Sequence, residues 1–258
     1  MAVTRLFSEE IYEAERQLKP IAPLTETYPD ITAEEAYRIQ LQYVERRLAD
    51  GVDVVGKKIG LTSRAMQEML GVDRPDYGHL LDDMIFESDV PVEAGRFIAP
   101  RVEFEIAFVL KKDIDGADAT AESVRDAIDY VIPAAEIIDS RIRDWKIKFE
   151  DTVADNGSSA GAVLGRDHVA LNDIDLPSVE MTVYKNGEKL DEGLGSAVLG
   201  NPLEAVVWLS KALHQYGISL KAGEVVLAGA LTKAVDVVPG DRFKATFEGL
   251  GEVEVSFS

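Results

Sequence analysis

The segment that most constrains the fold is the run RVEFEIAFVL at residues 101–110. Large apolar side chains occupy every second position, which predicts a β-strand with one fully apolar face. Glu103 and Glu105 then lie side by side on the opposite face, which continues as Ala107 and Val109. Two neighbouring carboxylates at the end of an otherwise apolar face repel each other and are costly to remove from water. A hard divalent cation is the simplest group that would compensate them, and a solvated acidic face on an edge strand is the alternative.

A third carboxylate, Glu136, interrupts the apolar run VIPAAEII at residues 131–138. An isolated carboxylate in a buried segment needs a partner, because it would otherwise become neutral. The pattern leaves two partners open, namely a nearby arginine (Arg141 or Arg143) or a cation shared with the other two glutamates. Three carboxylates together form an oxygen site typical of Mg²⁺ or Mn²⁺.

Two further side chains are candidates for chemistry on weaker patterns. Lys58 ends a β-like segment just before a glycine and two hydroxyl residues, where an ammonium group could hold a substrate carboxylate or donate a proton. Asp76 lies in the turn-like sequence RPDYG, and the pattern alone equally fits an ordinary turn aspartate. The loop DNGSSAG at residues 155–161 consists of small and polar residues, which let a backbone approach a ligand closely.

Composition excludes several classes of function. The chain has 258 residues, no cysteine and a net charge of -20. The charge argues against nucleic acid and anionic membranes as partners, and the lack of cysteine excludes disulfides and thiolate chemistry. No apolar run approaches the roughly 20 residues that cross a bilayer. With no signal-peptide core near Met1, we expect a cytoplasmic protein.

The pattern of elements predicts an α+β protein in two parts. Residues 1–51 are expected to form an N-terminal helical region, with a helix capped at Ser8 and a second one that starts from the capping box at Thr32. Residues 52–258 are expected to form a β-rich catalytic domain. Its predicted elements are a short helix at 124–130, a hairpin at 181–190 with Asn-Gly at the turn, a helix at 202–213, and strands at 224–230, 242–247 and 252–257.

Taken together, these motifs resemble the fumarylacetoacetate hydrolase family, in its hydratase and decarboxylase branch. The resemblance runs over nearly the whole chain. It is carried by the segments KIGLTS at 58–63, PDYG at 75–78, PRVEFE at 100–105, VIPAAE at 131–136, SRIRDW at 140–145, DTVADN at 151–156, LGNP at 199–202 and GALT at 229–232.

The resemblance implies a fold and a set of site residues. The fold is a mixed β-sandwich roll of the fumarylacetoacetase C-terminal type with an N-terminal helical extension. Glu103, Glu105 and Glu136 match the metal ligands of the family, for Mg²⁺ or Mn²⁺, and Lys58 and Asp76 match its catalytic residues. The positions of Leu61, Ser159 and Thr232 match the substrate side of the site.

The resemblance also implies an activity, which is hydration of 2-hydroxypenta-2,4-dienoate (2-oxopent-4-enoate) to 4-hydroxy-2-oxopentanoate in the meta-cleavage degradation of aromatics. Related activities stay open: decarboxylation of 4-oxalocrotonate, hydration of 2-oxohept-4-ene-1,7-dioate, and hydrolysis of acylpyruvates. A non-catalytic partner subunit is the alternative outside enzymes. The expected partners are a small 2-oxo- or 2-hydroxy-dienoate, other copies of the chain in a homo-oligomer, and a decarboxylase or aldolase of the same pathway.

Overall fold

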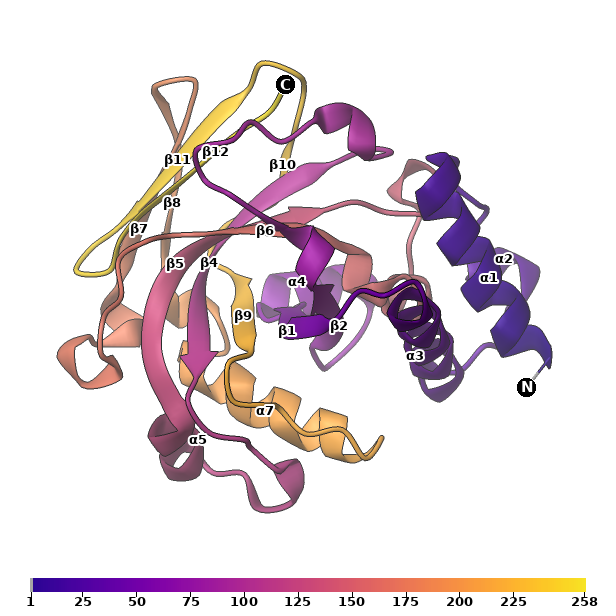
Figure 1. Ribbon diagram of the computed structural model, residues 1–258, viewed down its shortest axis with the longest axis horizontal. Coiled ribbons are helices and arrows are strands. Elements are labelled where there is room, and N and C mark those ends of the chain that lie inside the picture. The colour runs from indigo at the N-terminus through magenta and orange to yellow at the C-terminus, as the bar shows by residue number, and fades with distance from the viewer. Residues whose placement is uncertain (1) are drawn as a thin grey trace.

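Two β-sheets form the centre of the computed structural model, which describes residues 2–258 (Figure 1). The larger sheet has eight strands in the order β2-β1-β9-β4-β5-β6-β3, and β10 pairs with β4 outside this path. Its strands are β1 Val54–Gly60, β2 Asp76–Leu81, β3 Ile85–Phe86, β4 Arg101–Leu110, β5 Ile128–Ile138, β6 Ser159–Leu164, β9 Val225–Ala230 and β10 Val235–Asp236.

The smaller sheet has four strands in the order β12-β11-β7-β8. They are β7 Glu180–Lys185, β8 Glu188–Leu194, β11 Arg242–Phe247 and β12 Gly251–Ser256. The turn between β7 and β8 contains Asn186 and Gly187, both at positive φ, which confirms the predicted hairpin. In Figure 1 this sheet lies at the upper left, on the far side of the molecule from the N-terminal helices.

Seven α-helices within residues 2–258 surround the sheets. They are α1 Ala2–Gln17, α2 Leu24–Thr27, α3 Ala33–Ala49, α4 Arg64–Leu70, α5 Ala121–Ala127, α6 Phe149–Ala154 and α7 Pro202–His214. The first three lie together at one side of the molecule, while α5 and α7 lie beneath the strands (Figure 1). No helix among residues 2–258 is long and apolar enough to cross a membrane.

Local signals placed some helix ends correctly and others wrongly. The capping box of α3 is present, because the Thr32 side chain accepts from the Glu35 N–H and the Glu35 carboxylate accepts from Thr32. Ser8 does not cap a helix, since α1 already begins at Ala2 and the Ser8 hydroxyl donates to the Arg5 carbonyl within it. The helix predicted at 124–130 instead spans 121–127, because the chain enters the sheet at Ile128 opposite Leu110.

The predicted alternation along β4 is confirmed. Val102, Phe104, Ile106 and Phe108 belong to the main hydrophobic core, which also contains side chains from the N-terminal helices. Ala107 on the opposite face belongs to a second, smaller cluster of buried apolar side chains. One continuous core contains side chains from both sides of residue 51. The division of the chain into two parts at that residue stays a prediction.

Candidate active site and metal centre

Three carboxylates converge where β4 and β5 pair. Glu103 lies directly opposite Glu136 in the antiparallel register, and Glu105 follows on the same face of β4. Each of the three side chains contributes an oxygen atom, and these atoms lie within 4.8 Å of one another. The pairing of the two strands thus brings together residues that are more than 30 positions apart in the sequence.

This carboxylate cluster is largely buried, and few of its oxygens have a partner. Glu105 and Glu136 are 0 % exposed, and one Glu105 oxygen accepts a 2.7 Å hydrogen bond from the Gly229 N–H. The other Glu105 oxygen and both Glu136 oxygens have no hydrogen-bond partner among the described residues. Burial raises the pKa of Glu136 to about 7 and, with the neighbouring carboxylates, holds the pKa of Glu105 well above its usual range. Burial also raises the pKa of Glu103.

The prediction that an arginine pairs with Glu136 is wrong. Arg141 bonds to Asp155 instead, whereas the cation near Glu136 is Lys58, whose Nζ lies 3.5 Å from a carboxylate oxygen. One ammonium group facing three carboxylates leaves an excess of negative charge in a dry site. Several unpartnered carboxylate oxygens within reach of one point are the donor set that a hard divalent cation prefers, so the residues fit such an ion.

Lys58 and Asp76 come from two paired strands and meet beside this cluster. Asp76 lies opposite Gly60 in the β1–β2 register, and a Cβ placed on Gly60 would come within 2.2 Å of the Asp76 carboxylate and 3.1 Å of Lys58 Nζ. Lys58 Nζ also donates to the Gly157 carbonyl at 3.0 Å. Burial raises the pKa of Asp76. Burial acts to lower the pKa of Lys58, but Glu136 and the other nearby carboxylates outweigh it and raise the pKa.

A cavity of about 460 Å³ opens in front of these groups. Its polar wall includes Lys58, Asp76 and Glu103, whereas Glu105 and Glu136 are absent from its lining. Its apolar wall is formed by Leu61, Met66, Leu70, Ile138, Trp145 and Ile147. A site with converging charged groups at one end and an apolar wall suits a small organic acid with a hydrocarbon tail.

The three predicted substrate-side residues have different positions. Leu61 lines the cavity and holds a left-handed backbone conformation, with φ at 55°. Ser159 is buried at the start of β6, in register with Ile138, and its hydroxyl has no hydrogen-bond partner among the described residues. Thr232 lies outside the cavity lining, although Ala234 of the same segment belongs to it. The role of all three stays a prediction.

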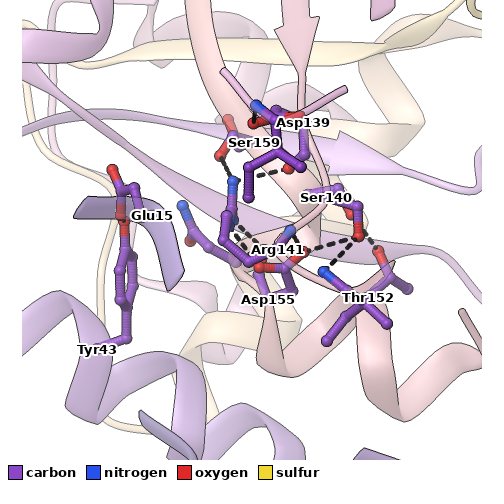
Figure 2. A network of polar contacts seen from close by, with 12 residues as sticks. Glu15, Tyr43, Asp139, Ser140, Arg141, Thr152, Asp155 and Ser159 are labelled. Carbon is purple, nitrogen blue, oxygen red and sulfur yellow. Dashed lines mark hydrogen bonds and ion pairs between the residues drawn. The ribbon is translucent and has the colours of Figure 1, made fainter. Parts of the chain in front are cut away.

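A buried arginine fixes the loop that borders the cavity. Figure 2 shows the side chain of Arg141 directed at Asp155, to which Nε donates at 2.5 Å. The guanidinium also donates to the carbonyls of Asp139, Ser159 and Asp155. The Asp155 carboxylate accepts from the Ser140 hydroxyl as well, at 3.2 Å. Because Gly157 and Ser158 line the cavity, this network holds the Gly157 carbonyl where Lys58 can bind it.

Several residues of the cavity lining were not identified as site residues from the sequence, among them Arg101, Trp145 and Thr152. Arg101 could have been found, because the alternation of β4 places it on the face of Glu103. Trp145 and Thr152 could not, since each reaches the cavity through the folding of the segment that follows β5. The sequence around them carries no periodic pattern that distinguishes a lining side chain from a surface one.

Comparisons with known proteins agree with this architecture. Residues 64–258 match the model of the family described as fumarylacetoacetate (FAA) hydrolase C-terminal. A 2-hydroxyhexa-2,4-dienoate hydratase of Comamonas testosteroni is 47% identical, covering 97% of this chain and 96% of that protein. A 2-keto-4-pentenoate hydratase of Paraburkholderia xenovorans is 46% identical, covering 97% of this chain and 93% of that protein.

A solved structure matches the whole fold. The 4-oxalocrotonate decarboxylase from Pseudomonas putida G7, complexed with magnesium and adipate, has a TM-score of 0.96 and 36% sequence identity, covering 100% of this chain and 98% of that one. The chain therefore belongs to the fumarylacetoacetate hydrolase family. The expected α+β fold of that family, with its mixed sheets and helices, is confirmed.

Proposed function

We propose that this chain is a hydro-lyase that adds water to 2-hydroxypenta-2,4-dienoate and yields 4-hydroxy-2-oxopentanoate. The observation that carries the proposal is the carboxylate cluster of Glu103, Glu105 and Glu136, with its unpartnered buried oxygens beside a cavity that also presents Lys58 and Asp76. The two hydratases at 46% and 47% identity support this chemistry over others of the family.

Glu103, Glu105 and Glu136 are proposed to hold one divalent cation, Mg²⁺ or Mn²⁺. The decarboxylase structure, described as a magnesium complex, supports a cation of this class. When bound, such an ion supplies Lewis-acid polarisation of the 2-oxygen of the substrate and neutralises the substrate carboxylate. This local positive charge also reconciles an anionic substrate with a protein of net charge -20.

The other polar residues of the site are proposed to move protons. The reaction requires the 2-hydroxyl to lose its proton and C5 to gain one, which forms the conjugated 2-oxo-3-enoate. Water then adds across C3 and C4, with its hydroxide at C4 and its proton at C3. We assign these transfers to Lys58 Nζ and the Asp76 carboxylate jointly, because both line the cavity and meet beside Gly60. An acid or base in such a position contributes on the order of 10²–10⁴-fold to the rate. The apolar wall excludes water from the rest of the tail.

An ultraviolet assay tests the proposal. Loss of the dienol absorbance of 2-hydroxypenta-2,4-dienoate should require Mg²⁺ or Mn²⁺, should give 4-hydroxy-2-oxopentanoate, and should fail with the Glu105→Gln variant. Turnover of 4-oxalocrotonate with release of CO₂, and none of the dienoate, would contradict hydration and assign the chain to decarboxylation. Inert protein after addition of either metal would favour a non-catalytic partner subunit.

The location, oligomeric state and pathway partners of the enzyme are proposed from its resemblance to the family. We infer a cytoplasmic homo-oligomer that takes its substrate in aromatic degradation and associates with a decarboxylase or aldolase of the same pathway. Size-exclusion chromatography with light scattering, alone and with such an enzyme, measures both associations.

A further inference from the structure

One face of β4 runs from the inside of the site to its entrance. Glu105 is 0 % exposed, Glu103 is partly buried, and the side chain of Arg101 is 35 % exposed. Alternate residues of a strand are about 6.8 Å apart, which is the scale of a chain of five or six carbons. A substrate whose 2-oxo acid end lies at the carboxylate cluster therefore directs its tail toward Arg101.

Arg101 is already matched by an acid of the protein. Asp236 of β10 lies opposite it in the antiparallel register, and its carboxylate accepts from Arg101 Nε at 2.8 Å. The guanidinium lies 4.4 Å from the ring centre of Trp145, whose own Nε1 donates to the Ala99 carbonyl at 3.0 Å. These contacts hold the guanidinium in place, and the Asp236 carboxylate offsets its positive charge.

A second carboxylate on the substrate would find no unpaired basic group in the described lining, because Lys58 and Arg101 each face a carboxylate of the protein. Asp144 adds a further negative charge there, countered by Lys146 at 3.8 Å. The neighbouring walls are aliphatic or aromatic, including Ile138 and Ile147. An alkyl end of the substrate packs favourably against these walls, whereas a carboxylate would lose its water without gaining a cation.

We propose that Asp236 is a specificity-determining residue, which makes the enzyme reject dicarboxylates by neutralising Arg101. The inference rests on the proposed function, because it takes the 2-oxo acid end to lie at Glu103, Glu105 and Glu136. Specificity of this kind comes from a repulsive element as much as from an attractive one. Removal of the Asp236 charge leaves Arg101 as an unpaired cation on the side of the cavity toward which the tail of the substrate is directed.

Two unreactive 2-oxo acids allow the binding of the substrate tail to be measured without turnover. The probes are 2-oxohexanoate and 2-oxoadipate, which differ only in the distal carboxylate, and their Kd values are measured by calorimetry with Mg²⁺ present. We expect the protein to bind 2-oxohexanoate more tightly than 2-oxoadipate. In the Asp236→Asn variant the ratio should move toward 2-oxoadipate by about three- to tenfold, the effect of one unit charge several ångströms away near a protein surface.

A matched variant controls for net charge. Asp126 is exposed on α5, at the opposite end of β5 from Glu136, and Asp126→Asn makes the same change in charge. Its Kd ratio should equal that of the unaltered protein. The shift in Asp236→Asn should also shrink as NaCl is raised, because the groups are partly exposed to solvent.

The outcomes separate the inference from the proposed function. An unchanged ratio in Asp236→Asn, or tighter binding of 2-oxoadipate by the unaltered protein, would overturn the role of Asp236 even if 2-hydroxypenta-2,4-dienoate is hydrated. A shifted ratio in a protein that hydrates no dienoate would instead refute the proposed reaction while the discrimination of tails stands.

Discussion

Lys58 Nζ lies 3.5 Å from a carboxylate oxygen of Glu136, and both side chains are in the interior of the protein. The pair is one of several charges packed together, since Lys58 also interacts with Asp76 and with the two glutamates of β4. Its neighbour Lys57 has the opposite orientation on β1 and bonds to Glu224 at 2.9 Å. The alternation of one strand thus separates a lysine of the site from a lysine of the scaffold.

The two lysines give a matched pair of variants. Lys58→Met should lower kcat for dienoate hydration by about 10²- to 10⁴-fold, because a proton-carrying group is lost. Lys57→Met should lower the free energy of unfolding, since Glu224 keeps a buried charge without its partner, but the folded variant should keep its kcat. Steady-state assays and urea unfolding measure the two effects. Equal losses of kcat in both variants would contradict the assignment.

Metal binding should appear as thermal stability. Protein freed of metal by chelation should rise in Tm when Mg²⁺ or Mn²⁺ is added, by the equivalent of about 2.7 kcal/mol at 100 times the Kd. Glu105→Gln should abolish this rise. Without metal the variant should be at least as stable as the unaltered protein, because a repelling charge is removed and the amide oxygen can still accept from Gly229. A rise in Tm that survives in Glu105→Gln would place the ion elsewhere.

Gly60 keeps space for the two catalytic candidates. Gly60→Ala should reduce kcat by at least 100-fold, roughly the loss caused by a displacement of about 1 Å in a site of this kind. The reason is that the new methyl group would meet the Asp76 carboxylate at 2.2 Å. Gly95→Ala is the control, because a Cβ at Gly95 meets nothing within 4 Å. Retention of full activity by Gly60→Ala would show that Asp76 needs no fixed position.

His79 should make the protein sensitive to acid. Burial and the nearby charge of Lys57 hold the pKa of His79 well below its usual value, and its Nδ1 lies 3.1 Å from the Gln40 amide oxygen. The folded state therefore stays unprotonated where the unfolded state, with a pKa near 6.5, takes up a proton. This contribution to stability is present above about pH 6.5 and is lost as the pH falls below it, by up to about 1.4 kcal/mol per pH unit.

Urea unfolding at a series of pH values measures that slope. His79→Gln should flatten the dependence between about pH 6.5 and pH 5. The exposed His168, which stacks on Tyr130 with ring centroids 3.9 Å apart, is the control for loss of a histidine. If both variants keep the slope of the unaltered protein, the acid sensitivity comes from other groups.

Features that depend on residues close together in the sequence could be predicted, whereas contacts between distant residues could not. The alternation of β4 and the Asn-Gly turn after β7 act over a few residues and were predicted correctly. The pairing of Arg141 with Asp155 was missed, because it depends on how the chain folds back after β5. Asp236 reaches Arg101 from 135 positions away, and no local pattern signals that contact.

The cluster of Glu103, Glu105 and Glu136 stands between these two cases. The sequence indicates that Glu103 and Glu105 share a face, whereas the arrival of Glu136 opposite them requires the β4–β5 register. The cluster was predicted because three carboxylates in apolar surroundings need a common partner. Trp145 reaches the site through a left-handed backbone conformation, with φ at 54°, which composition does not reveal.

The brevity of β10 has an evolutionary consequence. Arg101 and the carboxylates of β4 are bound into the centre of the larger sheet, so mutations there threaten both folding and reaction. Asp236 lies on a two-residue strand at the margin, with a side chain that is 82 % exposed, and its replacement by asparagine needs a single nucleotide change. If Asp236 sets the preference for the tail of the substrate, that preference can change by mutation at the margin of the sheet without a change in the carboxylates at its centre.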